Sequence, residues 1–344
     1  MSGQDKSLQK AVFYGKWHMK EEPKLTYDIH VHVAGNNYDE WGNYVKPKIS
    51  NRFLIKHFIK KLGIKAGKIE GISDLEKQIA DNMKSLISGC KIDRFTLLAI
   101  DAAHKENGEI DMERSQLIVS NRFVSSLAKT SNRLLFGGSI HPYRKDALDE
   151  LEQAAKDKVC LIKWLPSAQN INPSSKLCYD FYEALAHYKI PLLCHTGNEH
   201  ILGAFSNKLN DPVLLKTALE MGVTVIAAHC STKMYLYETD YFTKWKRMAL
   251  EYENFYGDTG AFIIPTRMIS LKSILKDDRL KNKVLYGSDF PTLNMIRSSF
   301  WILGLKKASM LHNIKNPLDQ YLEVMMHLGL TSNSLTKAGS ILRI

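Results

Sequence analysis

Asp28-Ile29-His30-Val31-His32 closes the first apolar run of the chain. On a β-strand, side chains two positions apart project from the same face, so Asp28, His30 and His32 are expected to project together. Two imidazoles about 6–7 Å apart along one strand can both reach a metal ion placed beyond its end. The alternative is a buried strand whose histidines only form hydrogen bonds to the backbone. The residues at the ends of the later strand-like runs favour the metal site.

The 344-residue chain has the composition of a soluble globular protein, with 44% hydrophobic and 24% charged residues. Its formal net charge of +11 raises the question of nucleic-acid binding. The lysines are scattered, however, and no arginine-rich block or base-stacking motif accompanies them. We therefore expect no nucleic-acid partner, but a solvated basic surface that steers a small anionic substrate towards its site.

The five cysteines indicate reduced thiols in a cytoplasmic protein. Their number is odd, no CxxC pair occurs, and Cys160 and Cys194 lie inside apolar strand-like runs. Cys230 directly follows a histidine but has no partner at ligand spacing, which favours a structural role. The polar first 24 residues do not have the pattern of a signal peptide, and no apolar run approaches a membrane span. We expect no membrane partner.

From Arg94 onward, strand-like runs alternate with helical segments, the first of which is predicted over 114–129. Together with the opening run they make eight strands, which predicts a parallel sheet closed into an α/β fold, the (β/α)₈ TIM barrel. An open, doubly wound sheet would not naturally place polar residues at the carboxyl end of nearly every strand. The predicted strands are 25–32, 95–100, 134–140, 159–164, 190–194, 223–228, 254–257 and 284–288.

The sequence predicts one barrel domain over 25–344, preceded by an N-terminal extension, 1–24. The segment 33–92 is too long for a simple connection after the first strand, so we expect a helical lid or subdomain beside the site. An apolar stripe predicts a helix over 52–62. A capping box at 73–76, Ser-Asp-Leu-Glu, predicts the start of another.

Polar residues stand at the carboxyl ends of nearly all the predicted strands. In a barrel these ends converge on one mouth, where barrel enzymes place their catalytic groups. Any one of these residues alone is more often a hydrogen-bonded structural residue, but the set supplies the nitrogen and oxygen ligands that zinc prefers, and that manganese or iron accept. The set consists of His30, His32, Asp101, His141, Lys163, His195, His229, Asp258 and Asp289.

Four stretches of the chain carry a combined pattern: Asp28–His32, Pro191–Gly197 (PLLCHTG), Ala228-His229 and Leu285–Pro291 (LYGSDFP). Together they resemble the metal-dependent hydrolases of the amidohydrolase superfamily. The resemblance is closer to its amidohydrolase-related group, which also contains aminocarboxymuconate-semialdehyde decarboxylase-like enzymes. It covers the chain from about Leu25 to the C-terminus.

The resemblance implies one divalent metal ion, for which we expect zinc, with manganese or iron as alternatives. It also implies that His229 is a ligand of a second ion or a catalytic group. A cation on such ligands leaves a position open for water and lowers the pKa of that water towards neutrality. Asp289 would accept the water's proton, and His229 would polarise a carbonyl group. The implied ligands of the ion are His30, His32, His195 and Asp289.

Lys163 leaves the number of ions open. In the binuclear branch of the superfamily, a carbamylated lysine at the end of the fourth strand bridges two ions, and Lys163 has that position. A free ammonium beside a dication would be repelled, so Lys163 must be carbamylated, neutral or angled away towards an anionic substrate. One ion is favoured, because the closest relatives mostly use one; two are expected if Lys163 is carbamylated.

Other polar residues near the predicted mouth are weaker candidates. Asp28 is expected either to orient a ligating histidine or to be a satisfied core carboxylate, and Asp258 either to orient a ligand or to cap a turn. Glu199 and His200 also suit a solvated loop, and Arg267 also suits a surface ion pair. The candidate substrate contacts are His141, Asn198, His200 and Arg267.

The sequence therefore predicts a metal-dependent hydrolase that uses metal-activated water to cleave an amide, lactone or ester bond of a small anionic molecule. A non-oxidative decarboxylase of an unsaturated or aromatic carboxylic acid would use the same ligands and is the main alternative. A barrel that binds a metal or small ligand without turnover is a third. A homodimer is expected from the resemblance and from the general frequency of symmetric dimers.

Overall fold

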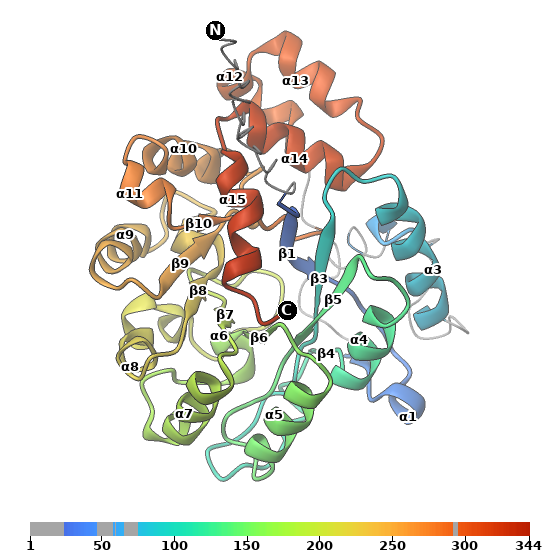
Figure 1. Ribbon diagram of the computed structural model, residues 1–344, viewed down its shortest axis with the longest axis vertical. Coiled ribbons are helices and arrows are strands. Elements are labelled where there is room, and N and C mark those ends of the chain that lie inside the picture. The colour runs from blue at the N-terminus through green and yellow to red at the C-terminus, as the bar shows by residue number, and fades with distance from the viewer. Residues whose placement is uncertain (1–23, 47–57, 59, 65–74, 292–294) are drawn as a thin grey trace, which may run out of the picture.

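The computed structural model describes residues 24–46, 58, 60–64, 75–291 and 295–344. Eight parallel strands form the wall of a barrel in the order β1-β3-β5-β6-β7-β8-β9-β10 (Figure 1). Each predicted strand overlaps an observed one, so the predicted TIM barrel is confirmed. The strands are β1 (Tyr27–His32), β3 (Arg94–Leu98), β5 (Leu134–Gly138), β6 (Leu161–Trp164), β7 (Leu192–Cys194), β8 (Val225–Ala227), β9 (Phe255–Asp258) and β10 (Val284–Leu285).

The first strand joins the segment that follows the last one and so closes the barrel. The backbone N–H of His32 donates to the carbonyl of Phe290 at 2.7 Å, and the N–H of Asp289 donates to the carbonyl of His30 at 2.8 Å. A parallel bridge between Val31 and Phe290 continues this pairing. The closure therefore sets two of the predicted metal ligands, His30 and Asp289, side by side.

Helices surround the strands, as expected when right-handed crossovers connect parallel strands (Figure 1). Those between the strands are α4 (Asn121–Ala128), α5 (Ala147–Lys156), α6 (Pro166–Gln169), α7 (Tyr179–Tyr188), α8 (Lys216–Glu220), α9 (Phe242–Glu251), α10 (Pro265–Ile274) and α11 (Asp278–Lys281). Those that follow the barrel are α12 (Phe300–Leu303), α13 (Leu305–His312), α14 (Pro317–His327) and α15 (Ser332–Thr336). No helix in the described ranges is both long and apolar enough to cross a membrane.

The interior of the barrel holds an apolar cluster of its own, separate from the larger core between strands and helices. The C-terminal segment contributes to it: Ala338 and Leu342 are buried there, and Figure 1 shows the C-terminus over the centre of the ring of strands. Gly339 lies against Tyr27, at the start of β1, so this segment fills the end opposite the mouth. The interior cluster consists of Tyr27, Ile29, Leu98, Cys160, Leu161, Leu193, Ile226, Ala228, Leu285, Ala338 and Leu342.

The insertion after β1 contains α1 (Tyr38–Trp41), β2 (Tyr44–Val45) and α3 (Leu75–Ser88), and β2 pairs antiparallel with β4 (Leu117–Ile118). The predicted helix over 114–129 is therefore wrong in its first part. Helix α4 begins only after Ser120, whose hydroxyl caps it by accepting the N–H of Phe123 at 3.1 Å.

Two predicted features of the insertion fall largely outside the described residues. Of the helix predicted over 52–62, only residues 58 and 60–62 are described, and of the capping box only Leu75 and Glu76. Glu76 has a different role from the one that a capping box assigns to it. Its Oε1 accepts the backbone N–H groups of Asn36 and Asn37 at 2.6 and 2.8 Å, and so ties α3 to the loop after β1.

Gly137 on β5 provides a test of the barrel wall. A Cβ atom there would lie 2.9 Å from the carbonyl oxygen of Leu97 and 2.7 Å from Leu98 Cδ2 on the neighbouring β3. We expect Gly137→Ala to lower the free energy of unfolding by about 1–3 kcal/mol, because the backbone of β3 would have to move to relieve the clash with the added methyl group. Urea titration followed by circular dichroism measures this. Gly89→Ala, whose Cβ would have no neighbour within 4 Å, should change it by less than about 0.5 kcal/mol; equal effects would contradict the packing.

Candidate metal centre

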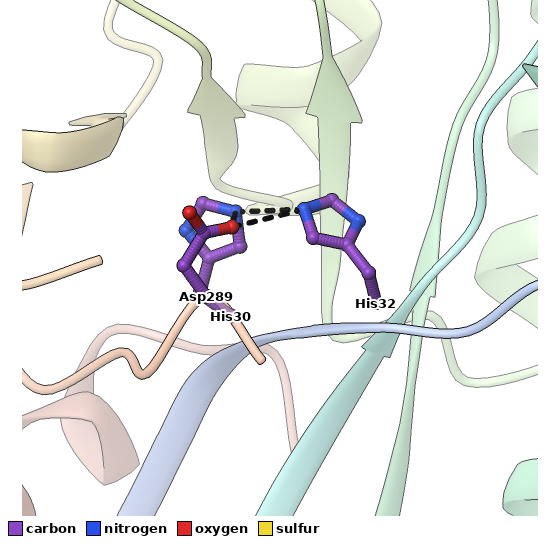
Figure 2. A group of neighbouring side chains, drawn as sticks. All are labelled: His30, His32 and Asp289. Carbon is purple, nitrogen blue, oxygen red and sulfur yellow. Dashed lines mark hydrogen bonds and ion pairs between the residues drawn. The ribbon is translucent and has the colours of Figure 1, made fainter. Parts of the chain in front are cut away.

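Three predicted ligand atoms converge at the mouth of the barrel (Figure 2). The Nε2 atoms of His30 and His32 are 3.2 Å apart, and each lies 3.3 Å from Oδ1 of Asp289. Four ligands at about 2.0–2.1 Å from a tetrahedral zinc ion are separated by about 3.3–3.4 Å from one another. The spacing of these three atoms therefore fits one such ion. The ligands come from β1 and from the turn after β10, which the barrel closure holds together.

Asp258, at the end of β9, orients the His30 ring. Its Oδ2 lies 2.7 Å from His30 Nδ1, while its Oδ1 accepts the backbone N–H groups of His229 and Gly260 at 2.7 and 2.8 Å. An ionised carboxylate only accepts hydrogen bonds, so Nδ1 of His30 carries the proton and Nε2 presents its lone pair to the centre. Asp258 thus orients a ligand and also caps a turn, the two roles between which the sequence did not choose.

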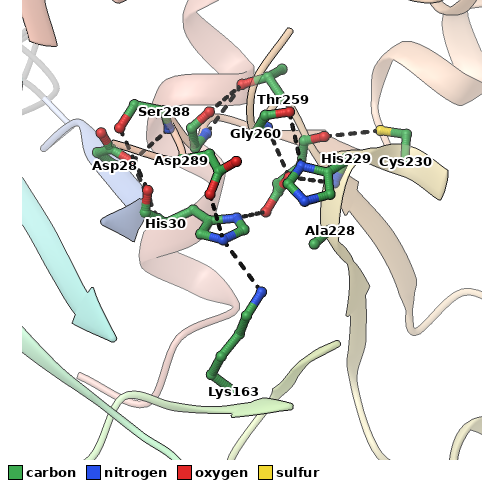
Figure 3. A network of polar contacts seen from close by, with 12 residues as sticks. Asp28, His30, Lys163, Ala228, His229, Cys230, Thr259, Gly260, Ser288 and Asp289 are labelled. Carbon is green, nitrogen blue, oxygen red and sulfur yellow. Dashed lines mark hydrogen bonds and ion pairs between the residues drawn. The ribbon is translucent and has the colours of Figure 1, made fainter. Parts of the chain in front are cut away.

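Asp28 positions the backbone of His30 rather than its ring. Its Oδ1 accepts the N–H of His30 at 3.2 Å and the N–H of Ser288 at 2.9 Å (Figure 3). Burial raises the pKa of Asp28 to about 7, although these hydrogen bonds act in the opposite direction. The expectation that Asp28 orients an imidazole is not met; the carboxylate instead joins β1 to the segment after β10.

His195, directly after β7, lines the same cavity as the three ligands. It does not belong to the group whose ligand atoms all lie within 4.8 Å of one another. Its Nε2 is buried and has no hydrogen-bond partner among the described residues, and Glu199 Oε2 lies 3.6 Å away. A buried ring nitrogen without a partner, facing a cluster of ligands, suits a fourth ligand.

His229 follows β8 in an unusual backbone conformation. It has a φ of 60°, and Cys230 and Ser231 follow with φ of 48° and 56°. Left-handed conformations of non-glycine residues cost free energy and concentrate at functional sites. Nδ1 of His229 lies 2.9 Å from the carbonyl oxygen of Gly260 (Figure 3), so this nitrogen carries the proton and Nε2 is an acceptor. The ring stacks on that of His30 at 5.4 Å.

Lys163 on β6 is fully buried and points into the cluster. Its Nζ lies 3.3 Å from His30 Nε2 (Figure 3). Leu161, two residues earlier, belongs to the interior cluster, so the alternation of the strand places Lys163 above it on the same face. Burial lowers the pKa of Lys163. Lys163 therefore points towards the predicted ligands instead of being angled away from the centre.

The charge states of these groups suit a cation. Burial lowers the pKa of His30 far below its usual value and that of His195 to about 4, and the neighbouring Lys163 adds to both effects. Burial would raise the pKa of Asp289, but His30, His32 and Lys163 outweigh it and hold the pKa at about 2. At neutral pH the centre therefore offers the neutral imidazoles of His30 and His195 and the carboxylate of Asp289, the forms in which these side chains bind metals.

The structure does not bring His141 to the cavity. Its Nε2 donates to the carbonyl of Gln169 at 2.8 Å, and its Nδ1 accepts the N–H of Tyr143 at 3.1 Å. Both ring nitrogens are occupied, so neither is left for a substrate. The strand-end position suggested a mouth residue, but the turn after β5 folds the ring into the barrel wall. Asp101 lies beside it, and its Oδ2 accepts the N–H of His141 at 2.8 Å.

The loop after β7 is ordered around Glu199 instead of being solvated. Oε1 of Glu199 accepts three consecutive backbone N–H groups, those of His200, Ile201 and Leu202, at 2.7–3.0 Å. The side chain is only 5% exposed. The interpretation of this glutamate as part of a solvated loop is therefore wrong, and the side chain lies beside His195, at the site.

Two cavities open above the cluster. The larger, about 130 Å³, has His30, His32, His195, His229 and Asp289 at its base. Residues of the insertion after β1 form much of its wall, as expected for a lid beside the site: Val33, Ala34, Val45, Phe58, Leu62, Ile64, Leu75 and Ile79. The smaller, about 50 Å³, contains three of the predicted substrate contacts: Asn198, His200 and Arg267.

Comparison with solved structures finds barrels of the same architecture. An uncharacterised TIM-barrel protein from Bordetella bronchiseptica is 14% identical, with a TM-score of 0.57 over 88% of this chain and 99% of that one. A probable 2-pyrone-4,6-dicarboxylic acid hydrolase from Acinetobacter baumannii, solved with citric acid bound, is 11% identical, with a TM-score of 0.50 over 90% and 97% of the chains. The chain shares the fold of these proteins.

A 5-carboxyvanillate decarboxylase from Novosphingobium aromaticivorans, solved with manganese, is 11% identical over 91% of this chain and 97% of that one; its TM-score of 0.49 is too low to support an argument. The two structures with TM-scores of 0.50 or more show the predicted barrel fold. No family model and no curated protein sequence matches the chain. At these identities the likeness establishes the fold, and the chemistry rests on the residues at the mouth.

Removing either β1 ligand tests the metal centre. We expect His30→Ala and His32→Ala each to reduce zinc uptake from about one ion per chain to below about 0.1, because the loss of one ligand from a set of four weakens zinc binding enough for dialysis to remove the ion. Elemental analysis after incubation with zinc and dialysis measures this. His187→Ala, an exposed histidine on α7, is the matched control and should retain full uptake. Unchanged uptake in both β1 variants would disprove the site.

The orienting role of Asp258 has its own test. Asp258→Asn keeps the shape of the side chain but removes the charge that fixes the proton on His30 Nδ1, so zinc affinity should fall by about 10–100-fold. Competition with a chromogenic chelator measures the dissociation constant. Asp278→Asn, at a side chain that is 88% exposed on α11, should leave the affinity unchanged. An unaltered affinity in Asp258→Asn would show that the contact is only structural.

Proposed function

We propose that the chain is a metal-dependent hydrolase of the amidohydrolase superfamily, with a single zinc ion and manganese or iron as alternatives. The observation that carries the proposal is the spacing of His30 Nε2, His32 Nε2 and Asp289 Oδ1 at 3.2–3.3 Å beneath a cavity. The buried, unpartnered Nε2 of His195 supports a fourth ligand. When bound, a divalent cation supplies Lewis acidity, which polarises a carbonyl group and lowers the pKa of water.

Asp289 is placed to move the proton. Oδ1 faces the two histidines of β1, whereas no described residue forms a hydrogen bond to Oδ2. The attacking water gives its proton to Oδ2, and the same atom then delivers the proton to the leaving group. The left-handed φ of Asp289, 58°, directs this side chain from the turn after β10 into the centre.

His229 presents an acceptor nitrogen to the reacting groups. Its Nε2 is free of protein partners among the described residues, and its ring is held by stacking on His30 and by the contact of Nδ1 with Gly260. Because Nδ1 carries the proton, Nε2 accepts a hydrogen bond from the attacking water and so orients that water towards the carbonyl carbon, instead of polarising the carbonyl oxygen as the sequence resemblance implied. Lys163 Nζ lies 3.3 Å from His30 Nε2 and would supply a further ligand group if carbamylated.

Turnover of a panel of esters, lactones and amides by zinc-loaded protein tests the proposal. We expect Asp289→Asn and His229→Ala to lower kcat/KM by at least about 100-fold, because each removes a group that acts in the transition state. His187→Ala should have no effect. The same panel includes hydroxybenzoates and muconate-type acids. Carbon dioxide release from these acids, with no hydrolysis of the other compounds, would overturn hydrolysis in favour of decarboxylation.

A further inference from the structure

We propose that the substrate consists of a carboxylate and an apolar group on opposite sides of the bond that is cleaved. Arg267 binds the carboxylate in the smaller cavity, and the larger cavity binds the apolar group. This inference rests on the proposed function, because it names the substrate class of the same centre. An acylated amino acid whose acyl group is aromatic or branched is the simplest compound with this order of groups.

Arg267, on the first turn of α10, is a buried cation for which no described residue supplies a counterion. The residue is only 5% exposed, and Nη1 donates one long hydrogen bond, 3.4 Å, to the carbonyl of Gly260. Nε is buried and has no hydrogen-bond partner in the part of the chain that the structure describes. No carboxylate in the described ranges lies within 4.0 Å of the guanidinium. A guanidinium keeps its charge in proteins, and a buried charge is costly unless an anion pairs with it.

The nearby carboxylates are engaged elsewhere. Glu238 holds His200 Nε2 at 2.5 Å and accepts the N–H of Met234 at 2.8 Å. Asp258 is bound to His30, and Asp289 faces the histidines of β1. Each of them acts on Arg267 electrostatically without contacting it. The guanidinium is therefore left for an anion from outside the chain, and its planar donors fit a carboxylate in two parallel hydrogen bonds.

The cavity beside Arg267 has the size of one small group. It measures about 50 Å³ and is lined by Asn198 and His200 as well as Arg267. It shares Phe58, Ile201, His229 and Asp289 with the larger cavity. His229 and Asp289 are the groups assigned to the chemical step. A carboxylate at Arg267 thus places the neighbouring bond of the substrate over the cluster.

The larger cavity, on the other side of the shared residues, accepts an apolar group. Apart from the predicted metal ligands, the only charged residue among the described residues that line it is Glu199, whose Oε1 accepts three backbone N–H groups. A second carboxylate or a polyol placed here would lose water without gaining partners. Residues of the wall include Val33, Ile79, Ile100, Leu117, Leu165 and Leu202.

The proposed reaction is hydrolysis of the amide bond of this substrate. The oxygen of water bonds to the acyl carbon, the carbon–nitrogen bond breaks, and the proton taken by Asp289 passes to the nitrogen. The products are an apolar carboxylic acid, which leaves from the larger cavity, and an amino acid, which leaves from the Arg267 side. No oxidant or further reactant is needed.

Ligand binding tests this assignment separately from turnover. N-benzoylglycine is the probe, and isothermal titration with both metal-free and zinc-loaded protein gives its dissociation constant. We expect it to bind at least about 10-fold more tightly than N-benzoylglycinamide, which lacks the charge, and than N-acetylglycine, which lacks the apolar body. Equal binding of all three compounds to the unaltered protein would overturn the proposal without the use of any variant.

Variants locate the two ends of the ligand. Arg267→Gln should weaken N-benzoylglycine about 10–100-fold and leave the amide unchanged, whereas Arg267→Lys should recover part of the loss. Leu117→Asn should weaken N-benzoylglycine but not N-acetylglycine. Melting curves verify that each variant is folded. A loss in Arg267→Gln that affects acid and amide equally would refute the carboxylate site. Selective binding without zinc uptake or hydrolysis would refute the proposed function and leave the ligand class standing.

Discussion

The pairing of β1 with the turn after β10 is the constraint on which the rest of the molecule depends. Backbone hydrogen bonds between residues 30–32 and 289–290 close the barrel, and the same bonds bring the histidines of β1 to Asp289. Asp28 reinforces this junction, because its carboxylate accepts N–H groups from both sides. The same hydrogen bonds therefore determine both the closure of the barrel and the geometry of the predicted ligands. A shift at this junction would open the barrel wall and would also separate the ligands.

Hydrogen bonds between buried polar groups at the mouth determine which ring nitrogen of His30 and of His229 carries the proton. Asp258 fixes the proton of His30, and Gly260, whose N–H it also accepts, fixes the proton of His229 through its carbonyl group. The Nδ1 atoms of His30 and His229 are thereby occupied, and their Nε2 atoms are left as acceptors. Such preorganisation means that these two rings need little rearrangement when a cation arrives.

The sequence was sufficient to predict the barrel and most of the centre, because alternation of strands with helices and polar residues at strand ends are local patterns. Lys163 shows the strength of this reasoning, since the two-residue period of β6 places it on the interior face. His141 shows the limit: it also follows a strand, but the conformation of the next turn decides where its ring points. That conformation depends on Gln169, a distant residue whose carbonyl accepts the hydrogen bond.

The burial of Arg267 and Glu199 could not be predicted for a related reason. On a helix or loop, the sequence gives no indication of whether a charged side chain is buried, because burial depends on which segments pack over it. Likewise, Ser120 predicts the start of α4 only once β4 is known to occupy the preceding residues. Local chemistry thus predicts which residue types gather at the mouth, and tertiary packing determines their final contacts.

The barrel closes only when β1 pairs with the segment after β10, and this has a consequence for folding during synthesis. His30 and His32 are synthesised long before Asp289, with which they share the junction. During synthesis the two histidines therefore have no carboxylate partner until the segment after β10 has been made. The three side chains can come together only after nearly the whole ring of strands is available to fold.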